Sequence, residues 1–396
     1  MGDTYDAAPM PDPIPLVRDR AIVTAFAALG MWGYCLYAMG PVLVALRADL
    51  GVSRTQIGTA GTALALGSIT GGLASPALFA RMRQGPLLAV AVLLIAAASA
   101  GFAVAWSLPA VLAAAFVLGV GGSLATIVVP VIVDTRQPHA RAVGITEANS
   151  WAGAVGVASP LVIGGAIALG IGWTAGPWCG AVAGLAVAWL ARGLPPAAPP
   201  PGARVTGDVP DARGFGGSFW RWWAVLVCGV AVEFCITFWA ADFMQTAVGM
   251  SPGLASGLMG VFVGGLAAGR FAGARLVGRR PPDRLVAAAY GLLLAGGAVF
   301  WAAREPVVSV AGLALLGLGV SVVFPLSMAL AIGAAPPGAA EGASTRISLG
   351  ASMAILAAPF ALGALGDAVG PRRGFLLVPA IVLVALALIA ARRPRL

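Results

Sequence analysis

Long apolar stretches follow one another along almost the whole chain, and short polar or Gly- and Pro-rich breaks separate them. A helix that crosses a membrane needs about 20 mostly apolar residues. Twelve stretches approach or exceed this length, so the pattern predicts twelve membrane-spanning helices. We expect them near residues 21–46, 56–79, 86–106, 108–133, 143–170, 172–191, 220–246, 252–276, 285–303, 306–333, 343–366 and 374–391.

The longest break separates two halves with six predicted helices each. Its many Pro and Gly residues are typical of a flexible linker. The expected fold is an all-α membrane protein with two pseudo-symmetric six-helix bundles. The predicted order is a tail (1–20), the first bundle (21–192), a cytoplasmic linker (193–219), the second bundle (220–391) and a short tail (392–396).

The composition agrees with a membrane protein. Hydrophobic residues make up 60% of the chain and charged residues 10%, whereas soluble domains have about 45–50% and about 25%. The net charge of +9 comes from Arg alone, because the chain contains no Lys. These Arg residues gather in the loops between spans, so we expect the lipid bilayer and not nucleic acid as the partner.

The distribution of Arg also predicts an orientation. With the N-terminus inside, 17 of the 24 Arg residues fall on the cytoplasmic side and five on the outer side. Cytoplasmic loops of membrane proteins carry such an excess of positive charge. We therefore expect a monomeric, multi-pass inner-membrane protein with both termini in the cytoplasm. The acidic N-terminal segment lacks the basic start of a signal peptide, so we expect no cleavage.

Short sequence matches between the halves indicate an internal repeat, offset by 193 to 199 residues. The matches are Leu118–Gly121 with Leu316–Gly319, Gly71–Ser75 with Gly264–Ala268, and the pair Pro160 and Gly164 with Pro359 and Gly363. Twelve spans, two repeated halves, a central linker and cytoplasmic termini resemble the major facilitator superfamily over nearly the whole chain. The resemblance implies a secondary transporter that works by alternating access.

Two family motifs are present in altered form. The loop after the second helix keeps Arg81 and Arg83, but Ala80 stands about where the family has an aspartate. The fifth helix resembles the glycine-proline motif of drug/proton antiporters, with Ser159 in place of the glycine before Pro160. A drug/proton antiporter therefore stays an alternative.

Small residues recur every four positions in the second and eighth helices. The glycines concerned are Gly67, Gly71, Gly260, Gly264, Gly265, Gly269 and Gly273. Such stripes let helix backbones approach closely in lipid. They predict either static packing or a smooth surface on which the two halves rock.

Glu233 is the candidate for proton coupling. It lies thirteen residues into the seventh predicted helix, about 20 Å deep at 1.5 Å per residue. An ionisable group at that depth is costly and is a functional-site candidate. The alternative is a structural glutamate that is neutral or hydrogen-bonded. Thr237 shares its face one turn on, and Asp242 is expected near the outer membrane interface.

Glu147 and Arg346 stand at equivalent positions, each thirteen residues before the proline of its helix. The family resemblance implies that Glu147 can meet Arg270 and that Arg346 can meet Asp134. We predict that these are gate pairs on the cytoplasmic side, formed in the outward-facing state and broken in the inward-facing state. Permanent structural pairing is the alternative.

The expected substrate cavity lies between the halves near the middle of the membrane. Its candidate residues are Trp32, Tyr34, Tyr37, Asn149, Trp151, Phe234, Thr237, Phe238 and Trp239. Helix packing is the alternative role for the aromatic members. A cavity with so few fixed charges suits a neutral, weakly polar or amphipathic solute, unless Arg270 or Arg346 faces it.

Motifs for other chemistry are missing from the sequence. A nucleotide-binding loop of the GxxxxGK[ST] kind needs a Lys, and the chain has none. His139 is the single histidine, and the four cysteines lie in apolar runs without metal-ligand spacing. We therefore expect no enzyme, metal or cofactor. The leading hypothesis is a proton-coupled transporter of a small molecule, with the direction open; a non-transporting sensor or scaffold and a channel are the alternatives.

Overall fold

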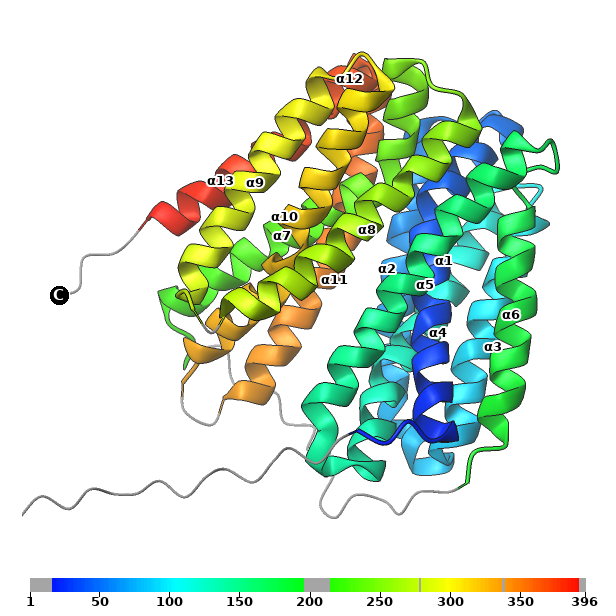
Figure 1. The fold of residues 1–396 in the computed structure, drawn as a ribbon, viewed down its shortest axis with the longest axis vertical. Coiled ribbons are helices and arrows are strands. Elements are labelled where there is room, and N and C mark those ends of the chain that lie inside the picture. The colour runs from blue at the N-terminus through cyan, green and yellow to red at the C-terminus, as the bar shows by residue number, and fades with distance from the viewer. Residues whose placement is uncertain (1–15, 196–213, 278, 337–338, 392–396) are drawn as a thin grey trace, which may run out of the picture.

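The computed structural model describes residues 16–195, 214–277, 279–336 and 339–391 (Figure 1). The protein is an all-α membrane protein of twelve transmembrane helices in two six-helix bundles. The first bundle consists of α1 (Arg20–Leu50), α2 (Arg54–Arg81), α3 (Gln84–Ala103), α4 (Leu108–Arg136), α5 (Arg141–Ala168) and α6 (Ala175–Arg192). The second consists of α7 (Gly217–Phe243), α8 (Pro252–Val277), α9 (Pro282–Ala302), α10 (Pro306–Gly333), α11 (Ala340–Val369) and the pair α12 (Pro371–Gly374) and α13 (Leu377–Ala390).

Length and hydropathy qualify eleven helices of the described chain as membrane spans, with α12 and α13 counted together. The helix α6 is the twelfth; Gly176, Pro177 and Arg192 lower its hydropathy. Several helices extend past the predicted ends, because hydropathy stops at the first charge. The helix α1, for example, continues through Arg47 to Leu50, and Gly51 caps it with a φ of 64°, which suits glycine.

The two bundles repeat the same helix contacts. The helix α2 packs on α4 as α8 packs on α10, and α1 packs on α5 as α7 packs on α11. Glycines allow the first of these contacts. A Cβ atom at Gly67 would lie 2.0 Å from the carbonyl oxygen of Phe116, and one at Gly265 would lie 2.9 Å from that of Ala314. The two contacts are therefore equivalent: Gly67 corresponds to Gly265 and Phe116 to Ala314, each at an offset of 198 residues.

This offset corrects one sequence match. Gly71 packs on the Val120 carbonyl, and Gly269 packs on the equivalent Leu318 carbonyl. Gly71 therefore corresponds to Gly269 and not to Gly264, which has open space where its Cβ would be. The stripe glycines at 67, 71, 265, 269 and 273 make close contacts within their own bundles, whereas Gly260 lies against Leu161 of α5 in the other bundle. Static packing and a surface for rocking therefore both stay predictions.

Across the bundles, α2 packs on α11 and α5 packs on α8, and α1 touches α7. The bundles approach each other at the end that carries α12 and diverge toward the end where α6 leads into the linker (Figure 1). We call these two ends the closed end and the linker end.

Candidate functional site

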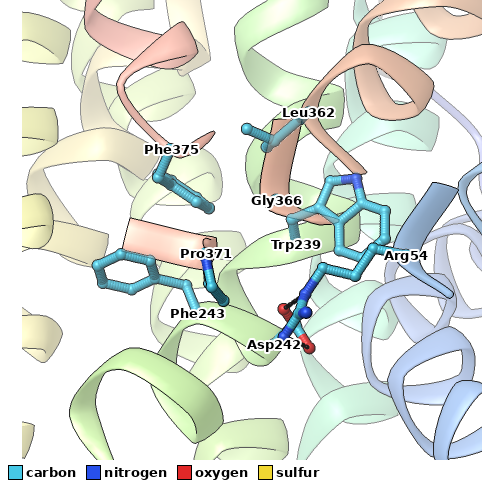
Figure 2. A pocket seen from close by; sticks show the side chains of 8 residues that line it. All are labelled: Arg54, Trp239, Asp242, Phe243, Leu362, Gly366, Pro371 and Phe375. Atoms are coloured by element: carbon cyan, nitrogen blue, oxygen red, sulfur yellow. Dashed lines mark hydrogen bonds and ion pairs between the residues drawn. The ribbon is translucent and has the colours of Figure 1, made fainter. Parts of the chain in front are cut away.

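An ionic cluster joins the two bundles at the closed end. Asp242, near the end of α7, accepts hydrogen bonds from Arg47 of α1 and from Arg54 of α2, each at 2.7 Å. Figure 2 shows the pair with Arg54. Its side chain is 3% exposed, and those of the two arginines are 21% and 15% exposed. One buried carboxylate of the second bundle is thus held by two guanidinium groups of the first.

A second tie runs from α11 to the start of α2. Asp367 accepts hydrogen bonds from the backbone N–H groups of Arg54, at 3.1 Å, and Thr55, at 2.7 Å. The Thr55 hydroxyl also donates to it at 2.7 Å. The first N–H groups of a helix lack partners within the helix. Asp367 therefore supplies part of the N-terminal cap of a helix in the other bundle.

Aromatic side chains fill the space behind these charges. Trp239 donates from its indole nitrogen to the Pro359 carbonyl oxygen at 2.7 Å and lies beside Arg54 (Figure 2). Phe243 and Phe375 stack with ring centroids 4.8 Å apart. Ionic ties and packed rings together seal the closed end.

Glu233 and Arg270 interact electrostatically without a salt bridge within 4.0 Å among the described residues. Glu233 on α7 is partly exposed, Arg270 on α8 is exposed, and the charge of Arg270 acts on the Glu233 carboxyl group. Both charges also act on Tyr37 of α1. Three residues that the sequence assigned to separate roles, in coupling, in a gate pair and in the cavity, are thus linked by electrostatic interaction across helices of both bundles.

The two predicted gate pairs are replaced by pairs within the first bundle. Glu147 accepts hydrogen bonds from Arg18 at 2.7 and 3.1 Å, and Asp134 lies 3.5 Å from Arg141. The hydrogen bond and the negative charge of Glu147 raise the pKa of the Arg18 guanidinium. The guanidinium of Arg346 stacks 4.5 Å from the ring of Phe215. The gate pairs stay a prediction for the conformation in which the linker end is closed.

Residues 16–19 are bound to the connection between α4 and α5. The backbone N–H of Val17 donates to the Gln137 side chain at 2.8 Å, and the Gln137 amide donates to the Val17 carbonyl oxygen. Leu16 is buried, and Asp19 caps α1 through the Ile22 N–H at 2.8 Å. This segment, which we call the N-terminal strap, carries the Arg18 that binds Glu147.

The aromatic candidates of α1 separate into different environments. The Tyr34 hydroxyl donates to the Gly176 carbonyl oxygen of α6 at 3.0 Å, so it lies inside the first bundle. This packing is the alternative role expected for the aromatic candidates, and a role of Tyr34 in the cavity stays a prediction. Trp32 covers Gly122 of α4, where a Cβ would lie 2.1 Å from its ring.

The candidates of α7 lie along the boundary between the bundles. Phe234 and Phe238 form a ring pair with centroids 6.1 Å apart, and Phe238 approaches Gly61 of α2. The Thr237 carbonyl oxygen would be 2.1 Å from a Cβ at Gly40 of α1. Trp239 lies at the closed end, where it binds the Pro359 carbonyl oxygen, and its role in the cavity stays a prediction.

The candidates of α5 lie nearer the linker end. Asn149 is exposed and donates to the Ile145 carbonyl oxygen of its own helix at 2.9 Å. Trp151 is 51% exposed. Both side chains are accessible, but neither contacts Glu233 or Arg270 through a hydrogen bond among the described residues.

Sequence reasoning misses Arg47, Arg54 and Asp367 as functional residues, because all three stand at polar positions at or beyond the expected helix ends. The available signal is Asp242, an acid placed within the end of an apolar helix, which requires cationic partners at the same depth.

Comparisons with known proteins agree with this architecture. A family model described as Major Facilitator Superfamily matches residues 21–349. No curated protein matches the chain.

Several solved transporter structures share the fold. A bacterial homolog of the human lysosomal transporter Spinster, in an inward-facing and unoccupied conformation, is 14% identical with a TM-score of 0.75; the match covers 94% of this chain and 96% of that one. The nucleoside transporter NupG, solved as a point mutant, is 12% identical with a TM-score of 0.79 over 94% and 99% of the two chains. A D-xylose-proton symporter is 12% identical with a TM-score of 0.75 over 95% and 98%.

Proposed function

Since the chain belongs to the Major Facilitator Superfamily, we propose that it is a secondary active transporter that moves a small organic solute across the inner membrane by alternating access. Membership in this family indicates a transporter rather than an enzyme. The bilayer-spanning helices form two repeated bundles, and a solute site between such repeats is the usual basis of alternating access.

The observation that supports this proposal is the difference between the two ends. Ion pairs and close backbone contacts join the bundles at the closed end, around Asp242 and Asp367. At the linker end the bundles diverge (Figure 1). The excess of Arg at the linker end favours a cytoplasmic location for it. On this basis the structure corresponds to the inward-facing state.

We assign proton coupling to Glu233. It is an acid at mid-membrane depth, it is partly exposed, and a cation acts on it. A carboxyl group whose surroundings change between two conformations can take up a proton in one and release it in the other. The drug/proton antiporter uses the same groups with the opposite direction of solute movement, and the fold is compatible with both.

The gate pairs complete the proposed cycle. When the linker end closes, Glu147 exchanges Arg18 for Arg270, and Asp134 exchanges Arg141 for Arg346. Breaking the ties of Asp242 accompanies this step at the other end. Each state thus has its own set of ion pairs between or within the bundles.

The experiment is a transport assay in proteoliposomes with Glu233→Gln. A thermal-shift screen at two pH values first selects a solute, because a ligand of the native state raises the melting temperature. We expect Glu233→Gln to abolish proton-driven accumulation and to leave exchange between equal solute pools intact. Glu305→Gln, at the exposed start of α10, is the matched control.

Other outcomes select the alternatives. Loss of both activities in Glu233→Gln shows that Glu233 is structural or binds the solute. A large unitary conductance replaces the carrier with a channel. No stabilising solute and no counterflow in the wild type favours the sensor or scaffold.

A further inference from the structure

A cavity of about 290 Å³ lies between the two bundles at the closed end. The first bundle lines one side with the last turns of α1 and with Trp173, in the connection between α5 and α6. The second bundle lines the other side with Gln245, which follows α7, and with Pro252 and Ser256 at the start of α8. Pockets for small ligands begin at about 300 Å³, so the cavity has the size for one small organic molecule.

Helical spacing explains the side that α1 contributes. Pro41, Val44 and Ala48 follow one another at three and four residues, so they share one face of the helix. Asp49 stands next to Ala48 in the last turn and also lines the cavity. It is exposed, so the cavity opens to the surface. This side of the cavity therefore has an apolar wall with a carboxylate at its mouth.

One hydrogen bond positions the carboxylate beside an aromatic ring. Trp173 donates from its indole nitrogen to the Asp49 side chain at 2.8 Å. The chain turns just before Trp173 at Gly170 and Gly172, whose φ values of 74° and 103° favour glycine. Because the indole N–H lies in the plane of the ring, the carboxylate is at the ring edge and covers neither face.

The lining carries a single formal charge. Asp49 supplies it, whereas the polar side chains of Gln245 and Ser256 are neutral. Arg47, two positions before Asp49, is bound to Asp242 at 2.7 Å, and no basic group of the described residues lies within 4.0 Å of the Asp49 carboxylate. The partial charges at the end of α1 and at the start of α8 have opposite signs and oppose each other. The charge of Asp49 therefore decides which ligand the cavity favours.

The Asp49 carboxylate has acceptor capacity to spare. Its two oxygens provide about four acceptor sites, and the bond from Trp173 uses one of them. An ammonium group has hydrogen-bond donors and no acceptor, and the face of a Trp ring attracts a cation within about 6 Å. A carboxylate and an indole held together in an otherwise apolar cavity thus suit an organic cation.

We propose that this cavity binds a small alkylammonium ion, with the positive charge between Asp49 and the Trp173 ring and the alkyl part against Pro41 and Ile167. A metal ion fits less well, because hard cations take about six to eight oxygen ligands. The described residues contain no group of three or more His, Cys, Asp or Glu that could hold one.

The site is separate from the solute pathway proposed above. None of the nine residues predicted for the central cavity lines it, and its occupancy does not depend on the transport function. An alkylammonium group has two sources at the membrane surface, a free solute and the headgroup of a lipid such as phosphatidylethanolamine. The experiment distinguishes them.

The first measurement compares ligands that differ in charge. The probes are choline, paired with its uncharged isostere in which carbon replaces nitrogen, and butylammonium, paired with butanol. Calorimetry measures their binding to the purified protein in maltoside micelles, which contain neither charge nor ammonium. We expect at least one cation to bind the wild type about tenfold more tightly than its neutral partner.

Substitutions test the two residues that hold the charge. Asp49→Asn should remove the preference for the cation, and so should Trp173→Ala. Trp173→Phe should keep part of it, because a ring remains while the N–H group is lost. Glu305→Gln is the matched control, since Glu305 is an exposed acid just before α10 and does not line the cavity. Melting temperatures check that every variant is folded.

Added lipid identifies the source of the ammonium group. If the headgroup occupies the site, phosphatidylethanolamine weakens the binding of the free cation to the wild type, and phosphatidylglycerol does not. Equal effects of the two lipids assign the site to a free solute.

Three results overturn the proposal: no cation binds at millimolar concentration, the neutral partners bind as tightly as the cations, or the preference survives in Asp49→Asn. Each of them leaves the transport function standing, because proteoliposomes test that function with Glu233→Gln.

Discussion

The two long contacts between the bundles have similar backbone geometry but different side-chain chemistry. In each, a glycine of one helix rests on a carbonyl oxygen in the first turn of its neighbour. A Cβ at Gly164 of α5 would lie 2.6 Å from the Gly253 oxygen of α8, and one at Gly363 of α11 would lie 2.7 Å from the Arg54 oxygen of α2. The first contact joins glycine to glycine. In the second contact the carbonyl oxygen belongs to Arg54, whose side chain binds Asp242.

Because of this difference, the α5–α8 and α2–α11 contacts have different roles. The α5–α8 contact, with Gly257 also against Gly164 and Leu161 against Gly260, is close apolar packing without an ion pair among the described residues, and such packing has no preferred charge partner. The α2–α11 contact adds Asp242 and Asp367, so it has a defined closed arrangement. We infer that the α5–α8 contact permits sliding and that the α2–α11 contact sets the resting state of the closed end.

The largest expected effect is that of Asp242→Asn. It leaves Arg47 and Arg54 without their buried anion, and breaking such a pair costs about 3 kcal/mol or more. We expect the closed end to open, seen as a longer distance between spin labels at Ala48→Cys and Ala368→Cys in a cysteine-free background.

Asp49→Asn is the matched control for this change. Asp49 lies at the same end but accepts a hydrogen bond from Trp173 of its own bundle at 2.8 Å. Its substitution should leave the label distance unchanged. An unchanged distance in Asp242→Asn as well would show that the ion pairs of Asp242 do not hold the closed end together.

An intermediate effect is expected from Gly164→Ala and Gly363→Ala. Each added methyl group meets backbone atoms closer than 3.0 Å, and overpacking of this kind costs about 1–3 kcal/mol. In Gly164→Ala the bundles can separate at α5–α8, so the label distance grows. In Gly363→Ala the ionic ties resist separation, so the melting temperature falls further and the distance changes less.

Gly165→Ala controls for the helix itself, because Gly165 has open space where its Cβ would be. It should be neutral or slightly stabilising, since Ala favours helices. Equal distances and equal melting temperatures in the Gly164 and Gly363 variants would remove the distinction between the two contacts.

The smallest effect is expected from Asp367→Ala. Loss of a helix cap costs about 1 kcal/mol, and α2 keeps its local cap from Ser53, which binds the Gln56 N–H at 3.1 Å. Because Asp367 caps α2 only in the closed state, its loss should also lengthen the label distance slightly. Ser53→Ala should lower the melting temperature with no change in distance; a shift of equal size in both would contradict the difference.

Hydropathy alone predicts the spans and the two halves, because the bilayer imposes helix length directly. The ion pairs of Asp242 with Arg47 and Arg54 cannot be predicted in this way, because hydropathy contains no information on contacts between helices. Arg47 and Arg54 read as helix-ending charges, and their partner Asp242 is 195 and 188 residues away in the chain. Contacts of that range depend on how the bundles meet.

One sequence match and one electrostatic interaction could also not be predicted correctly, and the causes are local to the helices concerned. The sequence match of Gly71 to Gly264 arises because Gly- and Ala-rich stretches allow a five-residue slip, which the packing of Gly269 resolves. Depth alone identifies Glu233, whereas the charge of Arg270 beside it depends on the rotation of α8. The hydrophobic periodicity of a helix determines its rotation about its axis only when its neighbouring helices are known.

The N-terminal strap has a consequence for biogenesis. Residues 16–19 leave the ribosome before α1, yet their binding partners Gln137 and Glu147 follow 120 and 129 positions later. Chains are synthesised from the N-terminus, so the strap must wait until α4 and the start of α5 have emerged. Its docking then marks the moment at which the first bundle has received nearly all its helices, and it couples the segment before α1 to the completion of the first half.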